Sequence, residues 1–170
     1  NIQKADNQYA LSAGASWVNG VAPGSDDVAF WNGEIAASGN WTYGLGANTA
    51  WHGLLITNSP SMLTITNDGS TLTLGAGGLV FATPTNYAHN CSIFSPVQVS
   101  ENQTWSIGNV PFYQRGPVSG DGKLTLAGGA NAFYDSIDLP AGLNVACWIT
   151  HLREDVVVPG PVTVSPYCNL

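Results

Sequence analysis

Short segments in which apolar and polar residues alternate run through this 170-residue chain and constrain its fold more than any other feature. Residues 62–66, 71–74, 104–107 and 123–126 alternate in this way, and Gly, Asn or Asp residues follow most of them. Successive side chains of a β-strand point to opposite faces, so each segment predicts a strand with one buried face. No segment has the 3.6-residue periodicity of an amphipathic helix, and the pattern therefore predicts an all-β fold.

The alternation also predicts which side chains face the interior. Leucine and isoleucine alternate with threonine, and the apolar members are the ones that gain free energy by leaving water. We expect the interior set to be Leu63, Ile65, Leu72, Leu74 and Leu124. We expect the wetter set to be Thr64, Thr66, Thr71, Thr73 and Thr125.

Two parts of the alternating pattern resemble each other. Residues 71–78 read TLTLGAGG and residues 123–130 read KLTLAGGA, with the strand-like residues 104–108 between them. Weak similarity between short strands with Gly-rich corners is typical of a stacked solenoid, in which each coil buries its apolar face against its neighbours. An antiparallel sandwich also has short strands and turns, so the pattern by itself leaves both folds open.

Residues 11–31 contain a series of motifs: Trp17, the turn Gly20-Val21-Ala22-Pro23 and the strand Asp27-Val28-Ala29. This series is similar to the repeat regions of bacterial autotransporter-associated β-strand repeat proteins. The resemblance continues through residues 45–47, 51–58, 72–78, 102–107 and 120–126, and so covers about residues 10–130, more than half of the chain. It implies a right-handed parallel β-helix in a secreted or surface-displayed protein, and it implies no particular activity.

The chain departs from those repeat proteins in its length and at its ends. It is far shorter than the large surface proteins that carry such repeats, and residues 135–170, with two cysteines and Pro159-Gly160-Pro161, do not follow the repeat pattern. We therefore expect an N-terminal extension at residues 1–12, a β-solenoid at 13–134 and a C-terminal cap or assembly segment at 135–170. The extension is a candidate for a strand that pairs with another subunit.

Charge is scarce in this chain and mostly negative. Charged residues make up 9% of it, and the formal net charge is −7. Nucleic acids and anionic membranes bind clustered Lys and Arg, and we expect neither as a partner because the basic residues are scattered. A surface rich in Thr, Ser, Asn and Gly gives little repulsion between like molecules, which favours self-association. The basic residues are Lys4, Arg115, Lys123 and Arg153.

The expected location is extracellular, at a bacterial cell surface. Uncharged β-forming residues with many Gly and Asn turns are typical of all-β extracellular domains. No apolar run reaches the roughly 18 residues that a membrane span needs. Residues 1–4 are polar and lack an initiator Met, as expected of a processed chain.

The three cysteines, Cys91, Cys147 and Cys168, form no Cys-x-x-Cys pair of the kind that binds zinc. One disulfide plus one leftover thiol is the simplest arrangement in an exported protein, and three buried reduced cysteines are the alternative. We predict a Cys147–Cys168 disulfide that ties the C-terminal segment to the last coil. The entropic model gives about 3 kcal/mol of stabilisation for its short loop.

No motif predicts catalysis, a cofactor or a metal ion. No Gly-x-Ser-x-Gly or His-Glu-x-x-His sequence occurs, and three histidines lie outside any such motif: His52, His89 and His151. The pairs Asp26-Asp27 and Glu154-Asp155 would point to opposite faces of a strand, so neither is automatically a catalytic dyad. We interpret the Asp residues as turn formers. A polysaccharide lyase or hydrolase is the enzyme alternative, because parallel β-helices can carry such activity and such enzymes use paired carboxylates.

Six tryptophans are unusually many for a chain of this size. Several occupy strand-like positions, where burial of a large apolar side chain gains about 1.5–3 kcal/mol, so we expect them to pack inside the coils. Exposed aromatic side chains in a groove would instead stack on sugar rings and indicate a carbohydrate-binding module or a monomeric adhesin.

These features predict a non-enzymatic structural β-solenoid that assembles with copies of itself into a surface filament or matrix. A short β-helix has two open ends with unpaired backbone groups, which must be capped or stacked. Head-to-tail stacking of identical copies would satisfy those groups and propagate as a fibre. Surface polysaccharide is the alternative partner. The candidate assembly contacts are Ile2, Tyr9, Leu11, Val156, Val157, Val158, Val162 and Val164.

Overall fold

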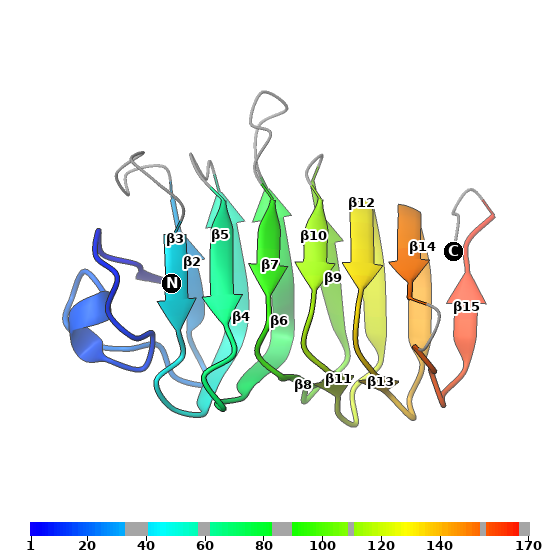
Figure 1. Cartoon of the computed structure of the whole chain (residues 1–170), viewed down its shortest axis with the longest axis horizontal. Helices are drawn as coiled ribbons and strands as arrows, with labels where there is room; N and C mark the ends of the chain where they lie inside the picture. The colour runs from blue at the N-terminus through cyan, green and yellow to red at the C-terminus, as the bar shows by residue number, and fades with distance from the viewer. Residues whose placement is uncertain (33–40, 58–61, 83–89, 109–110, 154–155, 167–170) are drawn as a thin grey trace.

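The computed structural model of the protein describes residues 1–32, 41–57, 62–82, 90–108, 111–153 and 156–166. The chain forms a right-handed parallel β-solenoid of about five turns, and Figure 1 shows it with its long axis horizontal. The predicted fold class is confirmed. Within the described ranges, the only helical element is the 3-10 turn η1 (Gly14–Ser16). These ranges contain no helix with the length and apolar character needed to cross a lipid bilayer.

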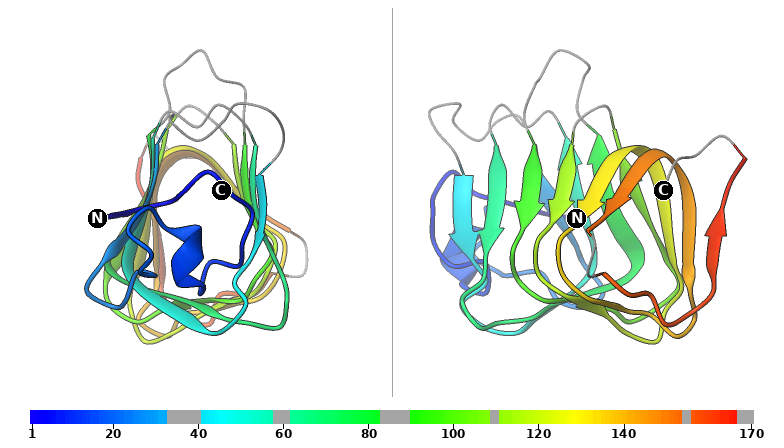
Figure 2. Two further views of the ribbon diagram at one scale, coloured as in Figure 1. Left: turned by 90° about the vertical axis from the view of Figure 1, so that its left-hand side faces the viewer. Right: turned by 45° about the vertical axis from the view of Figure 1, so that its right-hand side comes forward.

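Strands of successive coils pair in parallel and build three ladders along the solenoid axis. Four long strands, β4 (Thr49–Thr57), β6 (Leu72–Ala82), β12 (Leu124–Phe133) and β14 (Leu143–Leu152), each contribute to two ladders. Ladder A contains the second parts of β4 and β6 (residues 53–57 and 78–82) and the first parts of β12 and β14 (residues 124–128 and 143–147). It also contains β1 (Ile2–Gln3), β2 (Val28–Trp31), β9 (Gln103–Ile107) and β15 (Val162–Val164). Ladder B contains β3 (Trp41–Gly44), β5 (Leu63–Thr66), β7 (Cys91–Ile93), β10 (Phe112–Gln114) and the second parts of β12 and β14. Ladder C contains the first parts of β4 and β6, then β8 (Val97–Val99), β11 (Val118–Ser119) and β13 (Ile137–Asp138). The strands of ladder B lie at the front of Figure 1, and Figure 2 (left) looks along the axis.

The coils shorten from the N-terminal to the C-terminal end of the solenoid. In the early coils, paired positions of ladder A lie 25, 25 and 26 residues apart: Val28 with Gly53, Gly53 with Gly78, and Leu79 with Trp105. In the last three coils they lie 21, 19 and 19 residues apart: Gln103 with Leu124, Leu124 with Leu143, and Leu143 with Val162. The early coils therefore contain more residues than the last three, and most of the extra residues lie in the connections from ladder A to ladder B. We call the early coils wide and the last three narrow in this sense of residue number.

In the narrow coils, the corner between ladders A and B is part of a continuous strand. Within β12 this corner is built from Gly128, Gly129 and Ala130. Gly128 has a φ of +91°, and a Cβ there would collide with the carbonyl oxygen of Ile107 in the preceding coil. Glycine is needed at this position because no other residue tolerates both the conformation and the close approach.

The predicted direction of the side chains is confirmed. All five residues of the interior set are fully buried: Leu63, Ile65, Leu72, Leu74 and Leu124. All five threonines of the wetter set are partly exposed: Thr64, Thr66, Thr71, Thr73 and Thr125. The two-residue period of the sequence therefore reports the inside and the outside of each coil.

Five of the six tryptophans are buried, as expected for interior packing, and the side chain of Trp148 lies outside the described part. In the wide coils, the ring of Trp17 lies edge-on to Trp31 and Trp51, at centroid distances of 5.3 and 5.8 Å. In the narrower coils, Trp105 stacks on Phe133 at 6.0 Å. These rings fill the coil interior, so none of the five offers a platform for a sugar.

The expected boundary of the solenoid at residue 134 is wrong. β14 pairs with β12 at nine positions, and β15 pairs with β14 at three, so ladder A continues to Val164. The interior of β14 includes Cys147 and Thr150, which are buried although neither fits the Leu-Thr pattern. The Leu-Thr alternation in the sequence thus ends before the last coil, because small side chains such as Cys147 and Thr150 also occupy the interior there.

Leu72→Ala should lower the free energy of unfolding by about 2–5 kcal/mol, because it leaves a cavity between coils. Denaturant unfolding monitored by circular dichroism measures the loss. Thr125→Ala is the control on the outer face, and its loss should stay below about 1 kcal/mol. Equal losses for the two variants would contradict the assigned direction of the side chains.

Candidate functional site

The N-terminal end of the solenoid is covered by the chain itself. β1 pairs with β2 on one side, and residues 16–18 lie along its other side. There the Ala5 N–H donates to the Ser16 carbonyl at 2.9 Å, and the Val18 N–H donates to the Gln3 carbonyl at 3.0 Å. Residues 11 and 12 donate from their backbone N–H groups to the carbonyls of residues 44 and 45, just after β3. We call residues 1–18 the N-terminal cap. Figure 2 (left) shows it lying across the end of the coils.

A buried lysine holds the cap together. The Lys4 ammonium donates to the carbonyls of Ala5 and Asn7 at 2.9 and 2.8 Å and to Asn7 Oδ1 at 2.9 Å, which uses its three N–H donors. It also lies 4.7 Å from the centre of the Tyr43 ring. Burial lowers the pKa of Lys4 to about 8, and the nearby Asp6 carboxylate opposes part of that shift. The charge is therefore accommodated by hydrogen bonds inside one chain.

The cap corrects the expected role of the N-terminal segment as a free strand for a neighbouring subunit. Leu11 is fully buried in the core, and Ile2 is half-buried against it. Tyr9, at 59% exposure, is the well-exposed member of the three N-terminal candidate contacts. Leu11 and Ile2 therefore pack against the core of their own chain.

The C-terminal end has a different character. β15 pairs with β14 on one side, and within the described ranges no strand pairs with its other side. Val162 and Val164 are exposed, and Val157, in the connection that leads to β15, is 72% exposed. Val156 and Val158 pack against the core. This end therefore presents a short, uncharged strand edge with exposed valines, which we call the C-terminal edge.

The two described cysteines are buried. The Cys147 sulfur lies 2.9 Å from Thr150 Oγ1, and burial raises the pKa of Cys91 to about 12. Cys168 lies outside the described residues, so the Cys147–Cys168 disulfide stays a prediction.

The described carboxylates near strands serve turns. Asp27 accepts a hydrogen bond from the Gly24 N–H at 3.0 Å, and Asp68 accepts from the backbone N–H groups of Gly46 and Ser70. Slight burial acts to raise the pKa of Asp68, but these hydrogen bonds outweigh it and hold the pKa below its usual value. Within the described ranges, no group of three His, Cys, Asp or Glu side chains is placed to hold a metal ion. Glu154 and Asp155 lie outside these ranges.

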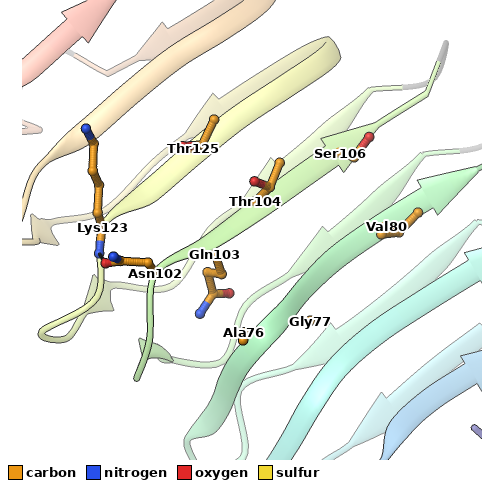
Figure 3. A pocket seen from close by; sticks show the side chains of 9 residues that line it. All are labelled: Ala76, Gly77, Val80, Asn102, Gln103, Thr104, Ser106, Lys123 and Thr125. Carbon is orange, nitrogen blue, oxygen red and sulfur yellow. Dashed lines mark hydrogen bonds between the residues drawn. The ribbon is translucent and has the colours of Figure 1, made fainter.

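A shallow polar hollow of about 330 Å³ lies on the outer side of ladder A (Figure 3). Its outward side chains include Thr104, Ser106 and Thr125, with Lys123 at one edge. The Lys123 backbone N–H donates to Asn102 Oδ1 at 2.8 Å, which ties this corner to the preceding coil. The lining offers hydroxyl and amide groups and one amine but no carboxylate, so it lacks an acid–base pair.

The outer side of ladder B carries a column of alternating aromatic and arginine side chains. Its members directly follow the last paired residue of ladder B in four successive coils: Phe94, Arg115, Tyr134 and Arg153. The Arg115 guanidinium lies 5.4 Å from the Phe94 ring and 4.5 Å from the Tyr134 ring, and that of Arg153 lies 4.8 Å from the Tyr134 ring. We call this set the aromatic–arginine column.

Sequence reasoning missed this column, since it treated the two arginines as scattered. A signal was present, because the four residues are spaced by 21, 19 and 19, the same intervals as the narrow coils. The predicted assembly contacts, in contrast, are divided between the two ends and are not brought together within the chain.

No family model matches the chain, and no curated protein or solved structure matches it either. The likeness to autotransporter-associated repeats therefore rests on the sequence motifs alone.

Lys4→Met should change how stability depends on pH. The pKa of Lys4 is about 8 in the folded state, against 10.5 for an ordinary lysine. Between these pH values the unfolded chain binds more protons than the folded chain. The free energy of unfolding of the wild type therefore increases with pH in this range. The variant lacks this gain. The difference in unfolding free energy between wild type and variant should therefore rise from pH 8 to 10.5, as measured by denaturant unfolding at several pH values.

Two other groups titrate in both proteins. Burial raises the pKa values of Cys91 and Tyr43 to about 12, so their contributions to stability fall as the pH rises above 9 and 10. Subtracting the two curves removes the contribution of Cys91. Tyr43 lies against Lys4, so the slopes are compared between pH 8 and 10, below the range in which Tyr43 contributes. Parallel curves across the whole range would show that Lys4 titrates as an ordinary exposed lysine.

Proposed function

We propose that the protein is a non-enzymatic structural module of a bacterial cell surface that associates with a second copy through the C-terminal edge. The exposed side of β15, with Val162 and Val164 on it, is the observation that carries this proposal. Unpaired backbone groups on a strand edge are a template for pairing with another chain, and this edge has no charge to block it.

A second copy fits this edge better than a head-to-tail neighbour does. Head-to-tail stacking needs both ends open, and the N-terminal cap occupies the opposite end with its own hydrogen bonds. Two copies that meet by their C-terminal edges form a two-fold contact, which closes on itself. Val162-Thr163-Val164 reads the same in both directions, so antiparallel pairing about Thr163 places valine opposite valine.

The structural role is supported by how the polar groups of the described chain are used. Asp27 and Asp68 bind backbone amides of turns, and Lys4 binds backbone carbonyls. Groups committed in this way stabilise the coils and are poorly placed for proton transfer. The extracellular location is supported by the scarcity of charge and by the motifs shared with surface repeat proteins.

Sedimentation of the wild-type protein over a range of concentrations tests the association. We expect a weak monomer–dimer equilibrium, with a Kd on the order of 0.1–1 mM, because only a short strand and a few valines are buried. Val164→Lys should abolish the dimer, since it places a charge opposite Val162 of the second copy and diagonally across from the second lysine. Val164 is exposed, so the variant should keep the circular dichroism spectrum of the wild type.

Tyr9→Lys is the matched control, because it adds the same charge at an exposed position of the opposite end. It should dimerise like the wild type. A wild type that is monomeric at about 1 mM would contradict the proposal. Species that keep growing with concentration, and that Tyr9→Lys disrupts, would instead support head-to-tail fibres.

A further inference from the structure

The aromatic–arginine column is a surface with an unusual charge for this protein. The net charge of the chain is −7, and one of its four basic residues, Lys4, is buried. Two of the other three, Arg115 and Arg153, stand two coils apart on the same line. Coils are separated by the strand spacing of about 4.8 Å, so the two guanidinium groups repeat at about 10 Å.

Stacking fixes these guanidinium groups while leaving their hydrogen-bonding edges available. Arg115 lies against Phe94, Tyr113 and Tyr134, at 5.4, 5.4 and 4.5 Å from the ring centres. A cation–π contact uses the face of the guanidinium, and its N–H groups point outward in the plane. Among the described residues, no carboxylate forms an ion pair with either arginine, and Asp135 accepts from the Ser136 N–H in its own turn.

A hollow of about 470 Å³ adjoins the column. It lies over the last coils of ladder B, where Tyr113, Ala132 and His151 are paired in register on β10, β12 and β14. These strands stand side by side in Figure 1. Ala132 is small, so a gap remains between the larger Tyr113 and His151 side chains. Tyr134 and Arg153 complete the lining.

We propose that the column and the hollow bind an acidic polysaccharide whose sugars carry carboxylate groups. Tyrosine rings pack against the apolar face of a sugar ring, and the hollow over Ala132 has room for one. Arginine binds a carboxylate through two parallel N–H···O bonds. A guanidinium group in every second coil, with an aromatic ring between the two, matches a ligand whose carboxylates recur along an axis.

The same features disfavour nucleic acid. Binding to a phosphate backbone depends on many Lys and Arg contacts, and a chain of net charge −7 with two arginines at the site offers few. The site therefore suits a ligand that needs few basic contacts and whose carboxylates are regularly spaced.

Calorimetric titration of the folded protein with an oligogalacturonate tests the site, with a neutral cello-oligosaccharide and a single-stranded oligonucleotide as the other arms. We expect the oligogalacturonate alone to bind, and its affinity to fall as salt is added. Arg115→Gln and Arg153→Gln should each weaken binding about tenfold, the usual effect of losing hydrogen bonds to a charged partner. Lys123→Gln is the matched control on ladder A and should bind like the wild type.

A fourth variant keeps the test independent of any loss of stacking in the arginine variants. Ala132→Leu fills the hollow, leaves both arginines in place and should also weaken binding. Circular dichroism and thermal unfolding verify that each variant is folded. No binding of oligogalacturonate at millimolar concentration would overturn the proposal. So would equal binding of the neutral oligosaccharide or of the oligonucleotide, or wild-type affinity in both arginine variants.

Discussion

Hydrogen bonding between successive coils is the interaction on which the rest of this structure depends. Each strand of a parallel ladder satisfies its backbone groups only through the coils before and after it, so a ladder is incomplete at its two ends. At the first end, residues 11–18 and the ammonium of Lys4 supply the missing partners from within the chain. At the last described coil, β15 keeps one side exposed. The two ends of the described solenoid are therefore chemically unequal, and the proposed association uses the second.

Aromatic rings and polar side chains both fill the interior of the coils. The wide early coils hold the edge-to-face cluster of Trp17, Trp31 and Trp51. The later coils also bury polar side chains, which are stabilised where they find an acceptor or donor inside. Gln103 shows how this is done: its amide donates to the Leu74 carbonyl at 2.8 Å, and its oxygen accepts from Trp105 Nε1 at 2.9 Å. Aromatic contacts continue there, since Trp105 also packs on Phe112 and Phe133, so the side-chain hydrogen bonds add to aromatic packing and do not replace it.

Sequence alone predicted the parts of the fold that depend on a two-residue period. Leu72 and Leu74 could be placed inside because alternation and burial follow the same rule. Lys4 could not be assigned to a cap, because its partners are backbone carbonyls, which leave no pattern in the side chains. The column of Phe94, Arg115 and their successors was missed for another reason. Residues one coil apart become neighbours only once the coil length is known, and that length changes along the chain.

The narrow coils also explain why the column lies where it does. Rings and guanidinium groups of successive coils can stack only if they lie one strand spacing apart, about 4.8 Å. Each coil must therefore carry an aromatic or arginine residue at the position that follows the last paired residue of ladder B. In the first two coils that position holds Gly44 and Thr66, and the stack starts at Phe94. It then runs to Arg153, beside the C-terminal edge but on a different side of the solenoid. A ligand along the column and a second copy at the edge would not compete, so one chain could bind a polymer laterally while joining another chain end to end. Two linked columns would hold the same polymer more tightly than either alone, because the second contact becomes intramolecular.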